Sequence, residues 1–148
     1  MGRIIFVPTG EREYTNLSKD DVLYTGDLEA CVAIAGIDKK KQDSRIYGAL
    51  AHITQITPLS DVISWFYEHI HIDEKVYIVG GMKCKSEQFV STIQAKLKEK
   101  GYTQFREVVL TEHYLDFSLG PDRAKVEYHI LRRDPMGLTK QCVGTKLI

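Results

Sequence analysis

The chain has 148 residues, and its 20 Lys and Arg balance 20 Asp and Glu, so the formal net charge is zero at neutral pH. This length suits one domain with a single substantial core, and the balanced charge gives no sign of a broad nucleic-acid-binding or anionic-membrane surface. Because apolar runs are far shorter than a bilayer span and no basic-then-apolar signal segment is seen, we expect no membrane insertion, with synthesis in the cytoplasm.

The three cysteines, Cys31, Cys84 and Cys142, are an odd number at wide spacing. This argues against a disulfide framework, favours a reducing compartment, and leaves at least one thiol free. No C-x-x-C or H-x-x-x-H spacing occurs, so we expect no metal site and no cofactor. That expectation also covers the remaining histidines, His69, His71, His113 and His129.

The N-terminal third begins with a predicted strand at Arg3–Val7, stopped by the turn residues Pro8-Thr9-Gly10. The polar segment Glu11–Asp21 has no period and is interpreted as a surface loop. After Val22-Leu23-Tyr24, the pair Gly26-Asp27 predicts a tight bend. Residues Cys31–Ile37 are small or branched and apolar, which favours a strand covered on both faces.

The charged run Asp38–Asp43 is interpreted as a solvated hairpin connection. Residues Ile46–Ile56 alternate as a strand, with Leu50 and His52 on one face and Ala49 and Ala51 on the other.

Two helices are predicted. Thr57 is the expected cap and Pro58 the first residue of the first helix. Its buried stripe comprises Leu59, Val62, Ile63, Phe66 and Ile70. A strand at Val76–Val79 should end at Gly80-Gly81. Ser86 is then the expected cap of a second helix, which stops at Lys100-Gly101 and has the buried row Phe89, Ile93 and Leu97.

The C-terminal third predicts a strand at Phe105–Leu110, then a hairpin of Tyr114–Leu119 and Ala124–Leu131 around Gly120-Pro121-Asp122. The pattern breaks at Asp134, and the tail to Ile148 is left unassigned. The whole chain, 1–148, is therefore predicted to be one layered α/β sandwich with mixed or antiparallel strands and two main helices.

Three side chains at the edges of neighbouring apolar runs could carry chemistry: Thr25, Cys31 and His52. If the strands that hold Cys31 and His52 pair, thiol and imidazole can meet, with the Thr25 hydroxyl on the far side of the ring. Cys31 and His52 each have an ordinary explanation. Most buried cysteines pack as small apolar residues, and most buried histidines are core residues with their hydrogen bonds satisfied. The glycine-rich turn at Gly80–Ser86 lacks the glycine that a phosphate-binding loop requires.

The pattern Thr-Gly-x-Leu-x-x-Cys-Val-Ala at Thr25–Ala33, followed by Gly-x-Leu-Ala-His at Gly48–His52, resembles the signature of CheD, the chemotaxis-receptor glutamine deamidase family. Looser likenesses follow at Val76–Met82 and Gly120–Val126. A similar thiol–imidazole arrangement occurs in deamidating toxins such as the cytotoxic necrotizing factors and Burkholderia lethal factor. The resemblance implies a CheD-like fold in which Cys31 is the nucleophile, His52 the base, and Thr25 the residue that orients the ring.

The chain departs from the CheD pattern near the nucleophile, where Glu29-Ala30 replaces the usual Gly-Ser before Cys31. A carboxylate there disfavours thiolate unless it points to solvent. The loop between the two strands is long for the family, and the proline that usually follows the histidine is displaced to Pro58. These differences bear on the substrate more than on the chemistry.

The resemblance implies hydrolysis of a protein glutamine side chain to glutamate with release of ammonia, through a thioester. The partner is then a protein that carries the target glutamine. Two roles stay open: a chemotaxis-receptor deamidase in the cytoplasm, and an effector or toxin delivered into a host cell without a classical signal peptide. The alternatives are an inactive protein-binding module on the same scaffold, and a transglutaminase or other thiol hydrolase. Neither the target nor the oligomeric state can be inferred.

Overall fold

A computed structural model describes residues 2–39, 44–110 and 113–148. Within these residues the chain forms ten strands and two helices, and the strands make two mixed five-stranded sheets. The predicted α/β class with two main helices is therefore confirmed.

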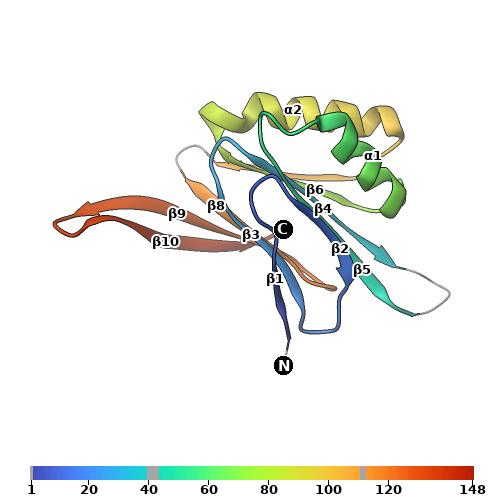
Figure 1. Cartoon of the computed structure of the whole chain (residues 1–148), viewed down its shortest axis with the longest axis horizontal. Helices are drawn as coiled ribbons and strands as arrows, with labels where there is room; N and C mark the ends of the chain where they lie inside the picture. Colours follow the sequence, from blue (N-terminus) through green and yellow to red (C-terminus); the bar gives the residue numbers. More distant parts are fainter. Residues whose placement is uncertain (1, 40–43, 111–112) are drawn as a thin grey trace.

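The first sheet has the order β2-β5-β4-β6-β7, and both helices lie on one of its faces (Figure 1). Its central strands pair antiparallel, whereas β6 and β7 are parallel. Its strands are β2 (Arg12–Asn16), β4 (Val32–Lys39), β5 (Ile46–Ile53), β6 (Val76–Met82) and β7 (Phe105–Leu110). The helices are α1 (Leu59–His69) and α2 (Lys83–Lys100).

The second sheet has the order β1-β3-β8-β9-β10, and β9 and β10 extend from the body as a long ribbon (Figure 1). Its pairings are antiparallel except for β1 with β3. Its strands are β1 (Ile4–Phe6), β3 (Val22–Leu28), β8 (Tyr114–Leu119), β9 (Ala124–Asp134) and β10 (Gly137–Leu147).

Two apolar clusters hold the layers together. The first lies between the helices and the first sheet and includes Ala49, Ala51 and the predicted α1 stripe. The second lies between the two sheets and includes Leu50 on β5 and Phe117 on β8. Alternate residues of β5 therefore enter different clusters, as the period of two predicted. The strand consequently has an inter-sheet face on which His52 follows Leu50.

Two segments for which no strand was predicted contain strands. The segment Glu11–Asp21 contains β2, which forms the edge of the first sheet by pairing with β5. The unassigned tail contains β10, an eleven-residue strand that pairs with β9 and is almost wholly exposed. Both were missed because edge strands with solvated side chains need no apolar alternation. Within the predicted hairpin connection Asp38–Asp43, residues 40–43 lie outside the described residues.

The predicted helix starts are also wrong in detail. Pro58, not Thr57, is the N-cap residue of α1, and Thr57 Oγ1 instead accepts a hydrogen bond from the Thr54 N–H at 2.9 Å. Strand β6 continues through Gly80-Gly81 to Met82, so α2 begins at Lys83 and Ser86 lies inside it. The predicted stop holds, because Gly101 adopts a left-handed φ of 109° after Lys100.

In the described part of the chain, neither helix combines the length and apolar character needed to cross a membrane.

Candidate active site

The predicted site lies between the two sheets, where β3 of one sheet meets β4 and β5 of the other. Thr25 is on β3 and fully buried, and His52 is on β5 and 2% exposed. The turn before β2 holds the backbone of His52 in place. The His52 N–H donates to Glu11 O at 2.9 Å, and the His52 carbonyl accepts from the Gly10 N–H at 3.0 Å. The two side chains meet across the inter-sheet space.

Thr25 determines which nitrogen of His52 carries the proton. Its hydroxyl donates to the Val7 carbonyl at 2.8 Å, and the same oxygen lies 2.7 Å from His52 Nδ1. Because the single hydroxyl proton is used toward Val7, the oxygen can only accept from Nδ1–H. A neutral His52 is therefore the Nδ1–H tautomer, and its Nε2 holds the free lone pair of a base.

His52 Nε2 is buried and has no hydrogen-bond partner within the described ranges. A buried acceptor without a partner is destabilising by about 1–3 kcal/mol, so such atoms usually have a functional reason. An S–H group or a substrate proton brought to this nitrogen would satisfy it.

Cys31 lies on the same face of the sheet as His52. Ala33 of β4 pairs with His52, and Cys31 directly precedes β4, two residues before Ala33, so a continuation of the alternation puts it on the side of the histidine. Its half-buried, free thiol packs against the inter-sheet cluster. Thr25 and His52 are thus in contact, whereas no hydrogen bond joins Cys31 to His52 Nε2 in the described chain.

The loop that carries Cys31 rests on the backbone of Gly81. A Cβ built on Gly81 would lie 2.2 Å from Leu28 O and 2.4 Å from Glu29 Cα, so only glycine fits. The next residue, Met82, donates its N–H to Glu29 O at 3.0 Å. The predicted bend at Gly26-Asp27 is a β-bulge, with Asp27 at a φ of 56°.

The charges around the loop are paired. Glu29, the carboxylate nearest the nucleophile in sequence, forms an ion pair with Lys85 of α2. Burial, followed by the negative charge of Glu29, raises the pKa of the Cys31 thiol. Burial lowers the pKa of His52, and the charge of Asp27 partly opposes this. Both shifts favour the neutral thiol and the neutral imidazole over a preformed ion pair.

Sequence reasoning missed a buried carboxylate, Asp116 on β8, that holds the bulge before Cys31. Its Oδ1 accepts from the Asp27 N–H at 3.0 Å, and its Oδ2 accepts from the Tyr24 hydroxyl at 2.7 Å. Lys140 of β10 reaches Asp116 at 2.8 Å and Asp27 Oδ1 at 2.8 Å. Burial acts to raise the pKa of Asp116, but the hydrogen bonds from Lys140, Tyr24 and Asp27 outweigh it and the pKa is lowered. Lys140 lies in the unassigned tail, so no sequence signal marked it.

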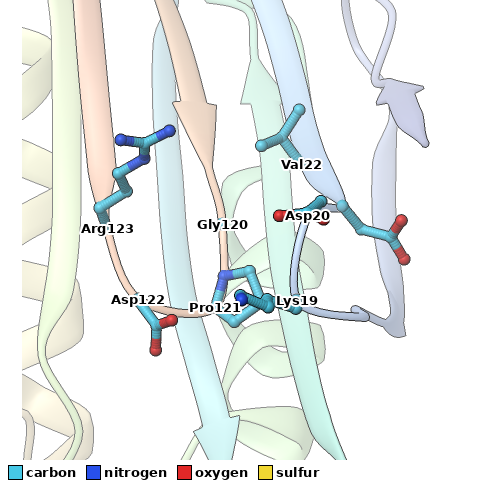
Figure 2. Close-up of a pocket in the computed structure, with 8 residues that line it drawn as sticks. Lys19, Asp20, Val22, Gly120, Pro121, Asp122 and Arg123 are labelled. Atoms are coloured by element: carbon cyan, nitrogen blue, oxygen red, sulfur yellow. The ribbon is translucent and has the colours of Figure 1, made fainter. Parts of the chain in front are cut away.

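A separate hollow of about 400 Å³ lies at the start of β3 and the β8–β9 turn (Figure 2). Both positively and negatively charged side chains line it, and none of the three predicted site residues is among them. Its lining comprises Lys19, Asp20, Asp21, Val22, Gly120, Pro121, Asp122 and Arg123.

Comparison with protein-family models gave no matching family, and comparison with curated proteins gave no significant match.

Proposed function

We propose that this chain is a cysteine-dependent protein-glutamine deamidase, with Cys31 as nucleophile, His52 as base and Thr25 as the residue that orients the ring. The observation that carries the proposal is the chain of contacts from the Val7 carbonyl through the Thr25 hydroxyl to His52 Nδ1. It leaves a buried lone pair at Nε2, on the face of the sheet where Cys31 lies. The resemblance of Thr25–Ala33 and Gly48–His52 to CheD supports the same assignment.

The reaction begins from a neutral pair. His52 Nε2 takes the Cys31 proton as the sulfur attacks the carboxamide carbon of the substrate glutamine. The C–N bond then breaks, and the imidazolium protonates the departing nitrogen, which leaves as ammonia. Water attacks the resulting thioester with His52 as base, the C–S bond breaks, and the products are glutamate and the free thiol. Backbone N–H groups near Cys31 would stabilise the oxyanion.

The shifted pKa values agree with proton transfer during attack. The pKa of Cys31 is raised and that of His52 is lowered, so the resting thiol keeps its proton. Thr25 is a neutral hydroxyl, which fixes the ring angle and tautomer but stabilises imidazolium less than a carboxylate does. The ion pair of Glu29 with Lys85 limits the negative charge beside the sulfur.

The alternative is a protein-binding module in which Cys31 is a packing residue. Two observations favour it: no hydrogen bond joins the Cys31 thiol to His52 Nε2 in the described chain, and burial raises the pKa of that thiol. Labelling with iodoacetamide at neutral pH separates the two. If His52 takes the thiol proton during attack, His52→Ala slows labelling of Cys31 and leaves labelling of the exposed Cys84 and Cys142 unchanged, whereas labelling of a packing residue does not depend on His52.

Intact-mass analysis tests the reaction itself. Candidate protein substrates are incubated with wild type and with Cys31→Ser, and Cys84→Ser serves as the matched control because Cys84 is exposed and lies in another element. The proposal expects the mass change of amide to acid with wild type and Cys84→Ser only. Equal conversion by Cys31→Ser would overturn it. Added primary amine distinguishes a transglutaminase, which would attach the amine instead of water.

A further inference from the structure

The ribbon of β9 and β10 places three metal-binding side chains together on the outer face of the second sheet. His129 faces Cys142 directly across the ladder, and Glu127 is two residues before His129 on the same side of β9. One ligand atom from each residue lies within 4.8 Å of the other two. No metal-binding motif marks these residues in the sequence, because the ladder, not the spacing along the chain, brings them together.

His129 is the unusual member of this group. It is 7% exposed, and both of its ring nitrogens are buried without a hydrogen-bond partner in the described part of the chain. Its Nε2 lies 3.1 Å from Asp116 Oδ2 and 3.8 Å from Glu127 Oε2, but neither contact has hydrogen-bond geometry. A neutral imidazole has one lone pair, and the carboxylate oxygens around it cannot satisfy that lone pair, whereas a proton or a metal ion can.

Two carboxylates lie near His129, those of Asp116 and Glu127, and their other contacts leave one oxygen, Oε2 of Glu127, to face the histidine. Asp116 already accepts from Tyr24, from the Asp27 N–H and from Lys140. Glu127 pairs through Oε1 with Lys125 at 3.2 Å, so its Oε2 faces His129. The cluster therefore offers one carboxylate oxygen, one imidazole nitrogen and one thiol.

We infer that Glu127, His129 and Cys142 form a binding site for a divalent transition-metal ion, with Zn²⁺ the best chemical match. Thiolate, imidazole and carboxylate are the ligand set of zinc, and three protein ligands leave one position for water. The ligands of one tetrahedral zinc lie roughly 3.3–3.8 Å apart, which the exposed Cys142 side chain can reach by a small rotation. Thiolate and carboxylate together neutralise the two charges of the ion.

Binding releases the proton of Cys142, whose thiol donates to Gly144 O at 3.5 Å when no ion is bound. Asp116, 3.1 Å from His129 Nε2, lies just outside the ligand set, and Lys140 offsets its charge. The bound ion would lock the β9–β10 register at the bulge between Cys142 and Gly144.

The test uses the full chain with Cys31→Ser and Cys84→Ser, which leaves Cys142 as the sole thiol and removes the proposed deamidase nucleophile from the experiment. Titration with Co²⁺ should give the thiolate-to-cobalt charge-transfer absorption, saturating at one equivalent, and Zn²⁺ should displace it. Zn²⁺ should also raise Tm. Adding Cys142→Ser should weaken Zn²⁺ binding about 100-fold or more, since a ligand is lost.

Because Cys142 is exposed, we expect Cys142→Ser to fold normally. Glu127→Gln gives a second test at a half-buried position. If no charge-transfer absorption develops, or if Zn²⁺ binds equally well after Cys142→Ser and Glu127→Gln, the inference is wrong.

Discussion

Two buried histidines, His52 and His129, occupy opposite surroundings in the same molecule. His52 lies between the sheets and has one nitrogen fixed by Thr25. His129 lies on the outer face of the second sheet, close to carboxylates, with neither nitrogen hydrogen-bonded in the described chain. A hydroxyl fixes a tautomer without adding charge and so prepares a proton acceptor, whereas carboxylate and thiol neighbours prepare a place for a cation.

The largest expected effect separates the two histidines directly. His52→Ala removes the base and should slow deamidation about 10²–10⁴-fold, while Zn²⁺ binding at His129 is unchanged. Ammonia release and Zn²⁺ titration are measured on the same preparation, with the exposed His71→Gln as control. Retention of deamidation would remove His52 from the mechanism, and loss of Zn²⁺ binding would show that the two sites are not independent.

Gly81→Ala tests how the loop of Cys31 is positioned near His52. The added methyl group would meet the backbone of Leu28 and Glu29, which cannot yield as a side-chain tip can. We expect a loss of about 1–3 kcal/mol in the free energy of unfolding together with a large fall in deamidation. Gly120→Ala is the matched control, because its Cβ would have no neighbour closer than 3.4 Å. Wild-type stability of Gly81→Ala in urea unfolding would contradict the described packing.

Thr25→Val tests whether the Thr25 hydroxyl fixes the tautomer of His52, a contact that His129 lacks. The variant keeps the shape but leaves His52 Nδ1 and the Val7 carbonyl without the hydroxyl, so we expect about 1–3 kcal/mol lower stability. Deamidation should fall roughly 10–100-fold, the range for losing an orienting partner. Thr25→Ser restores the hydroxyl and should recover most of the rate. Equal rates for Val and Ser variants would mean that the hydroxyl does not orient the ring.

The pH dependence of stability gives a smaller effect. Burial lowers the pKa of folded His52, so the unfolded chain takes up a proton first, near pH 6.5. The stabilising contribution of the neutral ring is present above that pH and is lost as the pH falls toward the folded pKa. The slope reaches at most about 1.4 kcal/mol per pH unit. Urea unfolding of His52→Gln should show a flatter dependence between about pH 7 and about pH 5, and parallel curves would contradict the assignment.

The smallest effect concerns the charge beside the nucleophile. Glu29→Gln removes a negative charge that raises the pKa of Cys31, so iodoacetamide should label Cys31 about two- to fivefold faster at neutral pH. Lys85→Met, which unpairs Glu29, should slow labelling. An electrostatic effect changes the labelling rate of Cys31 in opposite directions in the two variants. A change of the same sign in both would show that the effect is not electrostatic.

Much of the site was predictable because it depends on period and pairing. The alternation in Ile46–Ile56 placed Leu50 and His52 on one face, and the structure puts them on the inter-sheet face. The contact of Thr25 with His52 forms across the space between the two sheets, so strand pairing alone did not predict it. The acceptor behind Thr25 was not predictable, since it is the backbone carbonyl of Val7 and carries no sequence signal.

The remaining differences also have physical causes. Glycines that end a strand and glycines that admit a close backbone contact look alike in sequence, so Gly80-Gly81 was interpreted as a stop although Gly81 supports the Cys31 loop. Strand β10 is solvated on both faces and has no alternation to detect. Lys140 and Cys142 lie on that strand, so their contacts with β8 and β9 could not be predicted from the sequence.

The most direct test of the central claim is the rate of iodoacetamide labelling at each cysteine, measured by peptide mass analysis in wild type and His52→Ala. We expect His52→Ala to slow the labelling of half-buried Cys31 and to leave that of exposed Cys84 and Cys142 unchanged, because His52 takes the thiol proton as the sulfur attacks. Labelling of Cys31 at the same rate in wild type and in His52→Ala would contradict this.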